Sequence, residues 1–307
     1  MQALSKDLQL YTSGNRRRPP LLYEPRKDLL SPLLVQLFEE CDCDAETRAF
    51  LVSTRSISVV KLMLANLLSV FVSRTTACGI AGRGAMFVYS TEQIRRLLRP
   101  PQAPLTSPLP PDFQFESLLD IGAGNGGVTS KVAFLFKKVY VTEFSLSMRW
   151  RLRRLGYEVL PHEDPFHMNT PDALLERRYF DVITCNNVLD RADRPRTMLK
   201  EMREALKPNG FLVLAVVLPW CPFVENGTRQ KRPSEALPME GGECCRGASF
   251  EQSLRKLVEN VLLPMGFELV RWTRLPYLCE GSLRNEYAVL SDAVLILRKM
   301  DGFESPE

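Results

Sequence analysis

A glycine-rich turn is the part of this sequence whose residue types most clearly suggest chemistry. It runs from Asp120 to Gly127 as Asp-Ile-Gly-Ala-Gly-Asn-Gly-Gly. Glycines allow a sharp turn and let the backbone approach a ligand without a Cβ in the way. Gly122, Ala123 and Gly124 are therefore predicted to bind a nucleotide-like ligand, together with Asp120 before them. A tight loop without a ligand is the alternative for the turn taken alone.

Glu143 indicates which ligand the turn would hold. It follows the strand-like run 139–142, where its carboxylate can accept hydrogen bonds from both hydroxyls of a ribose. Dinucleotide-binding turns prefer Gly-x-Gly-x-x-Gly, whereas this turn has Gly-x-Gly-x-Gly after an aspartate. S-adenosylmethionine, which has no phosphate, is therefore favoured over NAD as the cofactor.

A second polar group follows the apolar run Phe180–Cys185, where Asn187 and Asp190 are the first candidates for reacting or ligand-binding residues. The ends of parallel strands are where doubly wound folds bind ligands. Turn and N-cap roles are the alternative for both residues. No metal site is predicted, because His162 and His167 are far from the cysteine pairs and no Cys-x-x-Cys is present.

Short β-branched runs alternate with amphipathic helical patterns, which predicts parallel strands joined by right-handed crossovers. The predicted strands are Ser117–Ile121, Lys138–Thr142, Tyr157–Leu160, Phe180–Cys185, Phe211–Val217, Phe267–Thr273 and Ala293–Arg298. The expected fold is α/β, a doubly wound, Rossmann-like sheet of seven strands as in class I methyltransferases, ending in an antiparallel hairpin.

Helix signals separate several of these strands. One predicted helix carries Met198 and Met202 on one face and stops at Lys207-Pro-Asn-Gly. Another opens at Ser249 with a capping-box spacing to Gln252 and ends near Gly266. Helical periodicity also covers Leu29–Phe38 and Thr47–Ser73. Four regions follow: 1–99, an N-terminal helical extension; 100–116, a proline-rich linker; 117–299, the cofactor domain; and 300–307, a tail.

Composition adds limits on partners. The chain has 40 Lys and Arg against 36 Asp and Glu, a balance that does not indicate nucleic acid. The most apolar segment, Ile57–Val72, is too short to span a membrane, and no signal peptide is recognised, so the cytoplasm is favoured.

The eight irregularly spaced cysteines are expected to be thiols. A monomer is expected.

From roughly Ala49 to its C-terminus the sequence resembles the DREV family, whose best-known member is a protein-histidine N-methyltransferase. The motifs that carry this resemblance are Ser73-Arg-Thr, Gly82-Arg-Gly-Ala-Met-Phe-Val-Tyr-Ser90, Leu118-Leu-Asp-Ile-Gly-Ala-Gly124, Leu189-Asp-Arg191, Val217-Leu-Pro219, Val224-Glu-Asn226 and Leu275-Pro-Tyr-Leu-Cys-Glu-Gly281. The resemblance implies methyl transfer from S-adenosylmethionine to the pros nitrogen of histidine in His-x-His segments of target proteins. Some family members associate with endomembranes or mitochondria.

The resemblance also implies roles for individual residues. The glycine turn and Asp120 would hold the cofactor, while Asn187, Asp190 and Tyr277 would face the substrate imidazole. Asp190 is the candidate acceptor for one ring N–H, which fixes the tautomer and aims the other nitrogen. The segments 161–178 and 227–247 depart from the family pattern and could change the substrate. The alternatives are another protein side chain, a small molecule, or a non-catalytic binding module.

Overall fold

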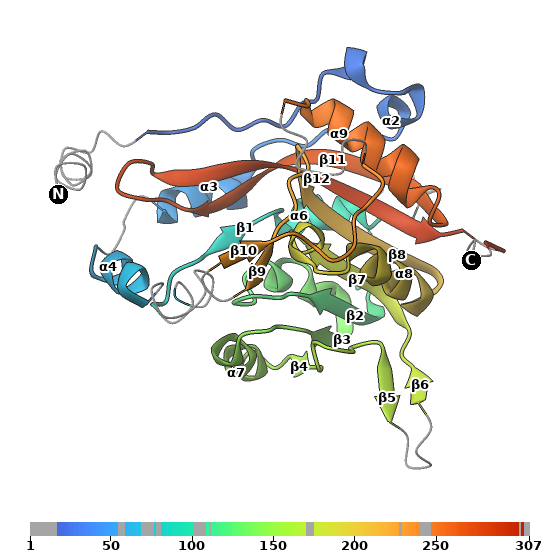
Figure 1. Cartoon of the computed structure of the whole chain (residues 1–307), viewed down its shortest axis with the longest axis horizontal. Coiled ribbons are helices and arrows are strands. Elements are labelled where there is room, and N and C mark those ends of the chain that lie inside the picture. The colour runs from blue at the N-terminus through green and yellow to red at the C-terminus, as the bar shows by residue number, and fades with distance from the viewer. Residues whose placement is uncertain are drawn as a thin grey trace.

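The computed structural model describes residues 17–54, 59–68, 77, 81–100, 109–110, 112–169, 175–226, 229–239, 247–300 and 302–303. Its centre is a sheet with the strand order β1-β11-β12-β8-β7-β2-β3-β4 (Figure 1). The strands are β1 Met86–Phe87, β2 Phe115–Ile121, β3 Phe136–Val141, β4 Glu158–Val159, β7 Phe180–Asn186, β8 Leu206–Val217, β11 Phe267–Glu280 and β12 Tyr287–Lys299. Separate hairpins are formed by β5 His167–Asn169 with β6 Leu175–Arg177 and by β9 Val224–Asn226 with β10 Arg229–Lys231.

The strand directions confirm the predicted fold class. β2, β3, β4, β7 and β8 run parallel, so their carboxyl ends lie at one edge of the sheet. β12 enters antiparallel to β8 and forms a long antiparallel hairpin with β11. The short strand β1, which the sequence did not predict, adds to the outside of β11 as an eighth strand.

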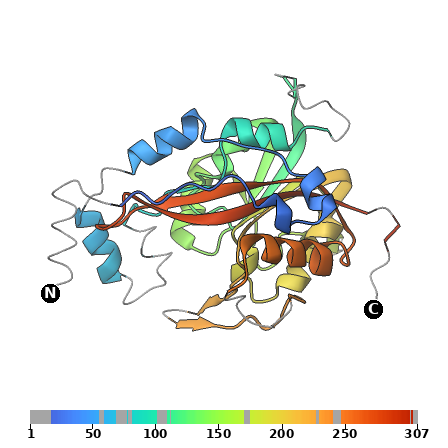
Figure 2. The ribbon, with the colours of Figure 1, turned by 90° about the horizontal axis from the view of Figure 1, so that it is seen from above.

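Helices cover both faces of the sheet (Figure 2). The α-helices are α2 Pro32–Gln36, α3 Ala45–Ser53, α4 Val59–Leu68, α6 Thr91–Leu97, α7 Leu146–Arg154, α8 Pro195–Ala205 and α9 Phe250–Lys256. Short 3-10 turns are η1 Lys27–Leu29, η2 Thr129–Lys131, η3 Ala133–Leu135 and η4 Leu189–Arg191, and the π-helix η5 Leu257–Leu262 continues α9. Side chains of β8 alternate between the faces. Leu212 and Leu214 pack in the cluster that contains Leu199 of α8, whereas Val213 packs in the cluster that contains Ile94 of α6.

Local sequence signals set most of these boundaries. The Ser249 side chain accepts from the Gln252 N–H, and the Gln252 side chain reaches back to the backbone of Ser249, as a capping box requires. Helix α8 ends at Ala205, but β8 starts at once, at Leu206 rather than at the predicted Phe211. Lys207-Pro-Asn-Gly follows the end of the helix and bulges out of β8, since Leu206 pairs with Phe180 and Phe211 pairs with Val182. Asn209 in this bulge has a φ of 62°.

The N-terminal helical region packs on the sheet. The Trp272 indole N–H of β11 donates to the Leu34 carbonyl oxygen of α2 at 2.8 Å, and the buried carboxylate of Glu39 binds Arg99 at 2.6 Å. The periodic segment Leu29–Phe38 contains only the short helix α2, and Thr47–Ser73 contains α3 and α4 with undescribed residues between and after them. Most of the proline-rich stretch also lies outside the described residues.

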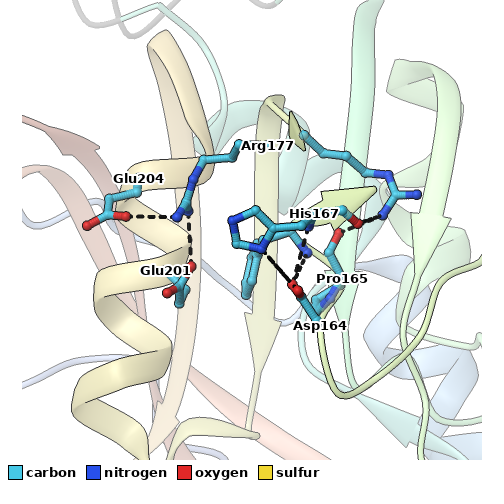
Figure 3. Close-up of polar contacts among 8 residues, drawn as sticks. Asp164, Pro165, His167, Arg177, Glu201 and Glu204 are labelled. Carbon is cyan, nitrogen blue, oxygen red and sulfur yellow. Dashed lines mark hydrogen bonds and ion pairs between the residues drawn. The ribbon is translucent and has the colours of Figure 1, made fainter. Parts of the chain in front are cut away.

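The long segment between Pro161 and Arg178 forms the β5–β6 hairpin, which is attached to α8 by ion pairs (Figure 3). Arg177 binds Glu201 and Glu204 of α8, each at 3.0 Å. At the other strand, Nδ1 of His167 lies 2.9 Å from Oδ1 of Asp164. His167 therefore has a structural partner within its own hairpin.

One expectation about the cysteines is wrong. Cys221 is disulfide-bonded, whereas Cys41, Cys43, Cys185 and Cys279 are free. Sequence spacing does not reveal which cysteines meet in a large fold. Within the described residues, no helix is long and apolar enough to cross a membrane, and no cluster of three or more His, Cys, Asp or Glu side chains suits a metal ion.

Candidate active site

The glycine turn lies at the carboxyl edge of the sheet and contacts the segment after β7. Gly122, Gly124 and Gly126 have φ values of 71°, 56° and 81°, which glycine adopts without strain. A Cβ on Gly122 would lie 2.5 Å from Cγ2 of Val188. Because Val188 follows Asn187 directly, the predicted cofactor turn and the predicted catalytic segment are in contact.

Glu143 is fixed at the rim of this turn. Its Oε2 accepts from the Gly124 N–H at 2.9 Å, and its Oε1 accepts from the Ser145 N–H at 2.8 Å. The Ala123 N–H donates to the Thr142 carbonyl oxygen at 2.9 Å, which holds the turn against the end of β3. The turn and the half-buried Glu143 carboxylate are thus side by side. This arrangement fits the adenosine part of S-adenosylmethionine, because the glycine backbone would lie beside the ligand and the carboxylate would accept from the ribose hydroxyls.

Asp120 lies beneath the turn instead of at its surface. It is 2% exposed, and its two oxygens accept from the hydroxyls of Thr129 and Thr184, both at 2.6 Å. Burial raises the pKa of Asp120 to about 6, although the two hydroxyls partly offset the effect. These bonds join β2, β7 and the first turn after the glycines, so Asp120 organises the loop from below.

Asn187 and Asp190 lie in the short segment that connects β7 with α8. Asn187 has a φ of 57°, a left-handed conformation that asparagine tolerates better than most residues, and its N–H donates to the Ala215 carbonyl oxygen. Asp190 is 3% exposed, and its Oδ2 lies 2.8 Å from Nη1 of Arg191. The Arg191 guanidinium also stacks on the Phe223 ring at 3.8 Å.

Asp292 of β12 belongs to the same site, and the sequence did not single it out. It is 0% exposed, and its Oδ2 accepts from the Asn187 side-chain amide at 2.7 Å. Burial, with a smaller contribution from the negative charge of Asp190, raises the pKa of Asp292 to about 8. The only sequence signal was a carboxylate next to the apolar run 293–297.

Oxygens of three side chains in this site are buried without a partner. They are Oδ1 of Asn187, Oδ1 of Asp190 and Oδ1 of Asp292. Buried acceptors normally find a donor, because leaving one unsatisfied costs about 1–3 kcal/mol. A bound group that carries hydrogen-bond donors would satisfy such acceptors.

Tyr277 reaches the site through Met86 of β1, another residue that the sequence did not predict. The Tyr277 hydroxyl donates to the Met86 sulfur at 2.7 Å, and a Cβ on Gly124 would lie 3.4 Å from the Met86 methyl carbon. Burial raises the pKa of Tyr277, and the charges of Asp292 and Asp190 raise it further. Among the described residues, the Tyr277 hydroxyl donates to Met86 and to neither Asp190 nor Asp292.

A cavity of about 330 Å³ adjoins the glycine turn on the side of α3 and β1. Phe50, Met86 and Phe87 form part of its apolar wall, while Asn125 and Gly127 come from the turn. Met86 therefore separates this cavity from Tyr277. The motif Gly82-Arg-Gly84 does not enter the site: its N–H and guanidinium groups bind Glu280 and Gly281 at the end of β11.

The profile of the DREV methyltransferase family matches residues 22–299. The chain belongs to the DREV methyltransferase family. The match covers the N-terminal helices as well as the sheet, so both are parts of the family's architecture. The family is one of methyltransferases, and the chain spans about two fifths of the length of the curated relative that it matches.

Individual relatives are more distant. A Schizosaccharomyces pombe protein, "Ubiquinone biosynthesis O-methyltransferase, mitochondrial", is 30% identical over 108 residues, which are 34% of this chain and 39% of that protein. The N-methyltransferase NodS from Bradyrhizobium japonicum WM9 is 19% identical over 62% of this chain and 88% of its own, with a TM-score of 0.36. Such a low score carries no argument, and the fold assignment rests on the strand order described above.

Proposed function

We propose that this DREV methyltransferase transfers a methyl group from S-adenosylmethionine to the pros nitrogen of histidine in His-x-His segments of proteins. The family resemblance supplies the substrate class. The observation in favour of it is the unpartnered buried oxygen of Asp190, which lies in the same segment as that of Asn187. A neutral imidazole brings one N–H donor and one lone pair on opposite sides of a ring, so it can satisfy an acceptor and attack a methyl group at the same time.

In this proposal, Asp190 orients the imidazole. Its Oδ1 accepts the N–H of the tele nitrogen, while Arg191 holds its Oδ2 at 2.8 Å and so fixes the carboxylate. The bound tautomer then has its lone pair on the pros nitrogen. Positioning of the two reactants lowers the activation barrier, because a nitrogen already held close to the methyl carbon loses little further translational and rotational entropy in the transition state.

S-adenosylmethionine supplies the methyl carbon, whose bond to sulfur breaks with the electron pair left on sulfur as the new bond to nitrogen forms. The ring becomes an imidazolium, and Asp190 stabilises the new positive charge across the N–H hydrogen bond. The tele proton then leaves, directly to Asp190 or to water after release, and the methylated ring is neutral again. Glu143 and the glycine turn would hold the cofactor throughout.

The proposal is tested with a peptide that contains Ala-His-Gly-His and with three variants in which one or both histidines are replaced by alanine. We expect labelled methyl from S-adenosylmethionine to enter the parent peptide, and hydrolysis of the product to release pros-methylhistidine. Loss of both histidines should abolish labelling. Label that persists without histidine, or tele-methylhistidine as the product, contradicts the proposal and points to another acceptor. Failure to bind S-adenosylhomocysteine would favour a non-catalytic binding module.

A further inference from the structure

We propose that Asp292 is a positioning residue that fixes the orientation of the Asn187 side chain, so that the Asn187 carbonyl oxygen faces the bound ligand. The inference rests on the proposed function in that it gives Asn187 a ligand to face. It assigns to β12, at the C-terminal end of the chain, a part in a site that otherwise comes from the segments after β2, β3 and β7.

The contact that carries this inference is short and buried. The Asn187 amide nitrogen donates to Oδ2 of Asp292 at 2.7 Å, and Asp292 is fully buried. The backbone of Asn187 is held independently, because its N–H donates to the Ala215 carbonyl oxygen at 2.9 Å. Both the start and the tip of the Asn187 side chain are thus fixed.

The direction of the amide follows from this contact. An asparagine amide has a donor end and an acceptor end, so a donor end that faces Asp292 leaves the acceptor end facing elsewhere. That acceptor, Oδ1 of Asn187, is buried and has no partner. Turning the amide over would place two acceptors against each other when Asp292 is ionised. Ionised Asp292, the form above its pKa of about 8, therefore selects an Asn187 that accepts a hydrogen bond from the ligand, whereas protonated Asp292 has an O–H that can also donate to the Asn187 oxygen.

Other ionisable groups face Asp292 from two elements. Asp190 lies on η4, with Arg191 paired to it, and Tyr277 and Cys279 lie on β11. Burial raises the pKa of Cys279 to about 11 and also raises that of Tyr277, so both stay neutral at physiological pH. Among the residues that the structure describes, the Asn187 amide is the one group that donates a hydrogen bond to Asp292.

The test uses two substitutions at Asp292, alone and combined with Asn187→Ala. Asp292→Asn keeps a carbonyl oxygen that can accept from the Asn187 amide, whereas Asp292→Leu removes the acceptor. The first measurement is the side-chain amide signal of Asn187 in ¹⁵N-labelled protein, identified by its absence in Asn187→Ala. We expect this signal to move in Asp292→Leu and to stay close to wild type in Asp292→Asn. Thermal unfolding establishes that each variant is folded.

The second measurement is kcat for methylation of the Ala-His-Gly-His peptide. We expect Asp292→Leu to lower kcat about tenfold, a typical effect of residues that orient a ligand-binding side chain, and Asp292→Asn to retain most of it. In the Asn187→Ala background, Asp292→Leu should change kcat less than about twofold, because a residue that acts through Asn187 has nothing left to orient.

If the loss of kcat in the double variant Asn187→Ala/Asp292→Leu equals the product of the losses in the two single variants, the proposal is overturned. Asp292 would then act on the ligand independently of Asn187. An Asn187 amide signal that is unchanged in Asp292→Leu would overturn it as well. If the wild-type protein does not methylate the peptide, the histidine proposal fails, whereas the amide signal still decides whether Asp292 orients Asn187.

Discussion

Asp120, Asp190 and Asp292 are buried carboxyl groups in one site, but their partners differ in a way that separates their roles. Asp120 receives a hydroxyl on each oxygen, so its hydrogen bonds are complete without a ligand. Asp190 and Asp292 each have one partnered oxygen and one unpartnered oxygen. The first pattern is that of a structural carboxyl. Asp190 keeps an acceptor for the ligand, whereas the partnered oxygen of Asp292 holds the Asn187 amide.

Gly122 offers a test at the scale of a single residue. Gly122→Ala would place a Cβ 2.5 Å from Val188, on the segment that carries Asn187 and Asp190. We expect the affinity for S-adenosylhomocysteine, measured by calorimetry, to fall about tenfold, which corresponds to about 1.4 kcal/mol. Gly156→Ala is the matched control, because Gly156 also has a positive φ of 86° but nothing within 4 Å of its Cβ position. Equal losses in both variants would show that backbone strain, and not the contact with Val188, is responsible.

At the scale of elements, the sequence predicted those features whose signals are local. The glycine turn, the carboxylate at the end of β3 and the capping box at Ser249 each depend on residues within a few positions of one another, and all three lie where they were expected. The parallel order of the central strands followed from the alternation of strand and helix patterns.

The features that the sequence missed depend on strand register. Asp292 meets Asn187 because β12 pairs with β8 at Asp292 and Val217, and no local pattern specifies that pairing. Met86 reaches Tyr277 because a two-residue strand adds to the outer edge of β11. The predicted last strand began at Ala293, one residue after Asp292, because a charged residue beside an apolar run predicts the boundary of the strand.

At the scale of the whole molecule, the buried carboxyl groups predict how stability depends on pH. The pKa values of Asp120 and Asp292 are raised to about 6 and about 8, whereas an unfolded aspartate ionises at about 3.9. Between these values the folded protein binds more protons than the unfolded chain, so the free energy of unfolding falls as the pH rises towards 8. The slope for one proton is at most about 1.4 kcal/mol per pH unit.

Asp292→Asn isolates one of these groups. Urea unfolding at pH 6 and at pH 8.5 should show that wild type loses more stability over this interval than Asp292→Asn does, because the variant has no proton to release there. The other titrating groups are common to both proteins and cancel in the difference. Parallel pH dependences would mean that Asp292 ionises outside this interval in the folded protein.

The role of Asp190 in histidine methylation is the central claim, and one measurement tests it most directly. The rate of methyl transfer to the Ala-His-Gly-His peptide is compared for wild type, Asp190→Asn and the exposed control Asp28→Asn. In Asp190→Asn the amide oxygen would turn towards Arg191 and leave its NH₂ group facing the imidazole N–H, so we expect kcat to fall about 100-fold with S-adenosylhomocysteine affinity unchanged. Asp28→Asn should match wild type. Full turnover by Asp190→Asn would contradict the account.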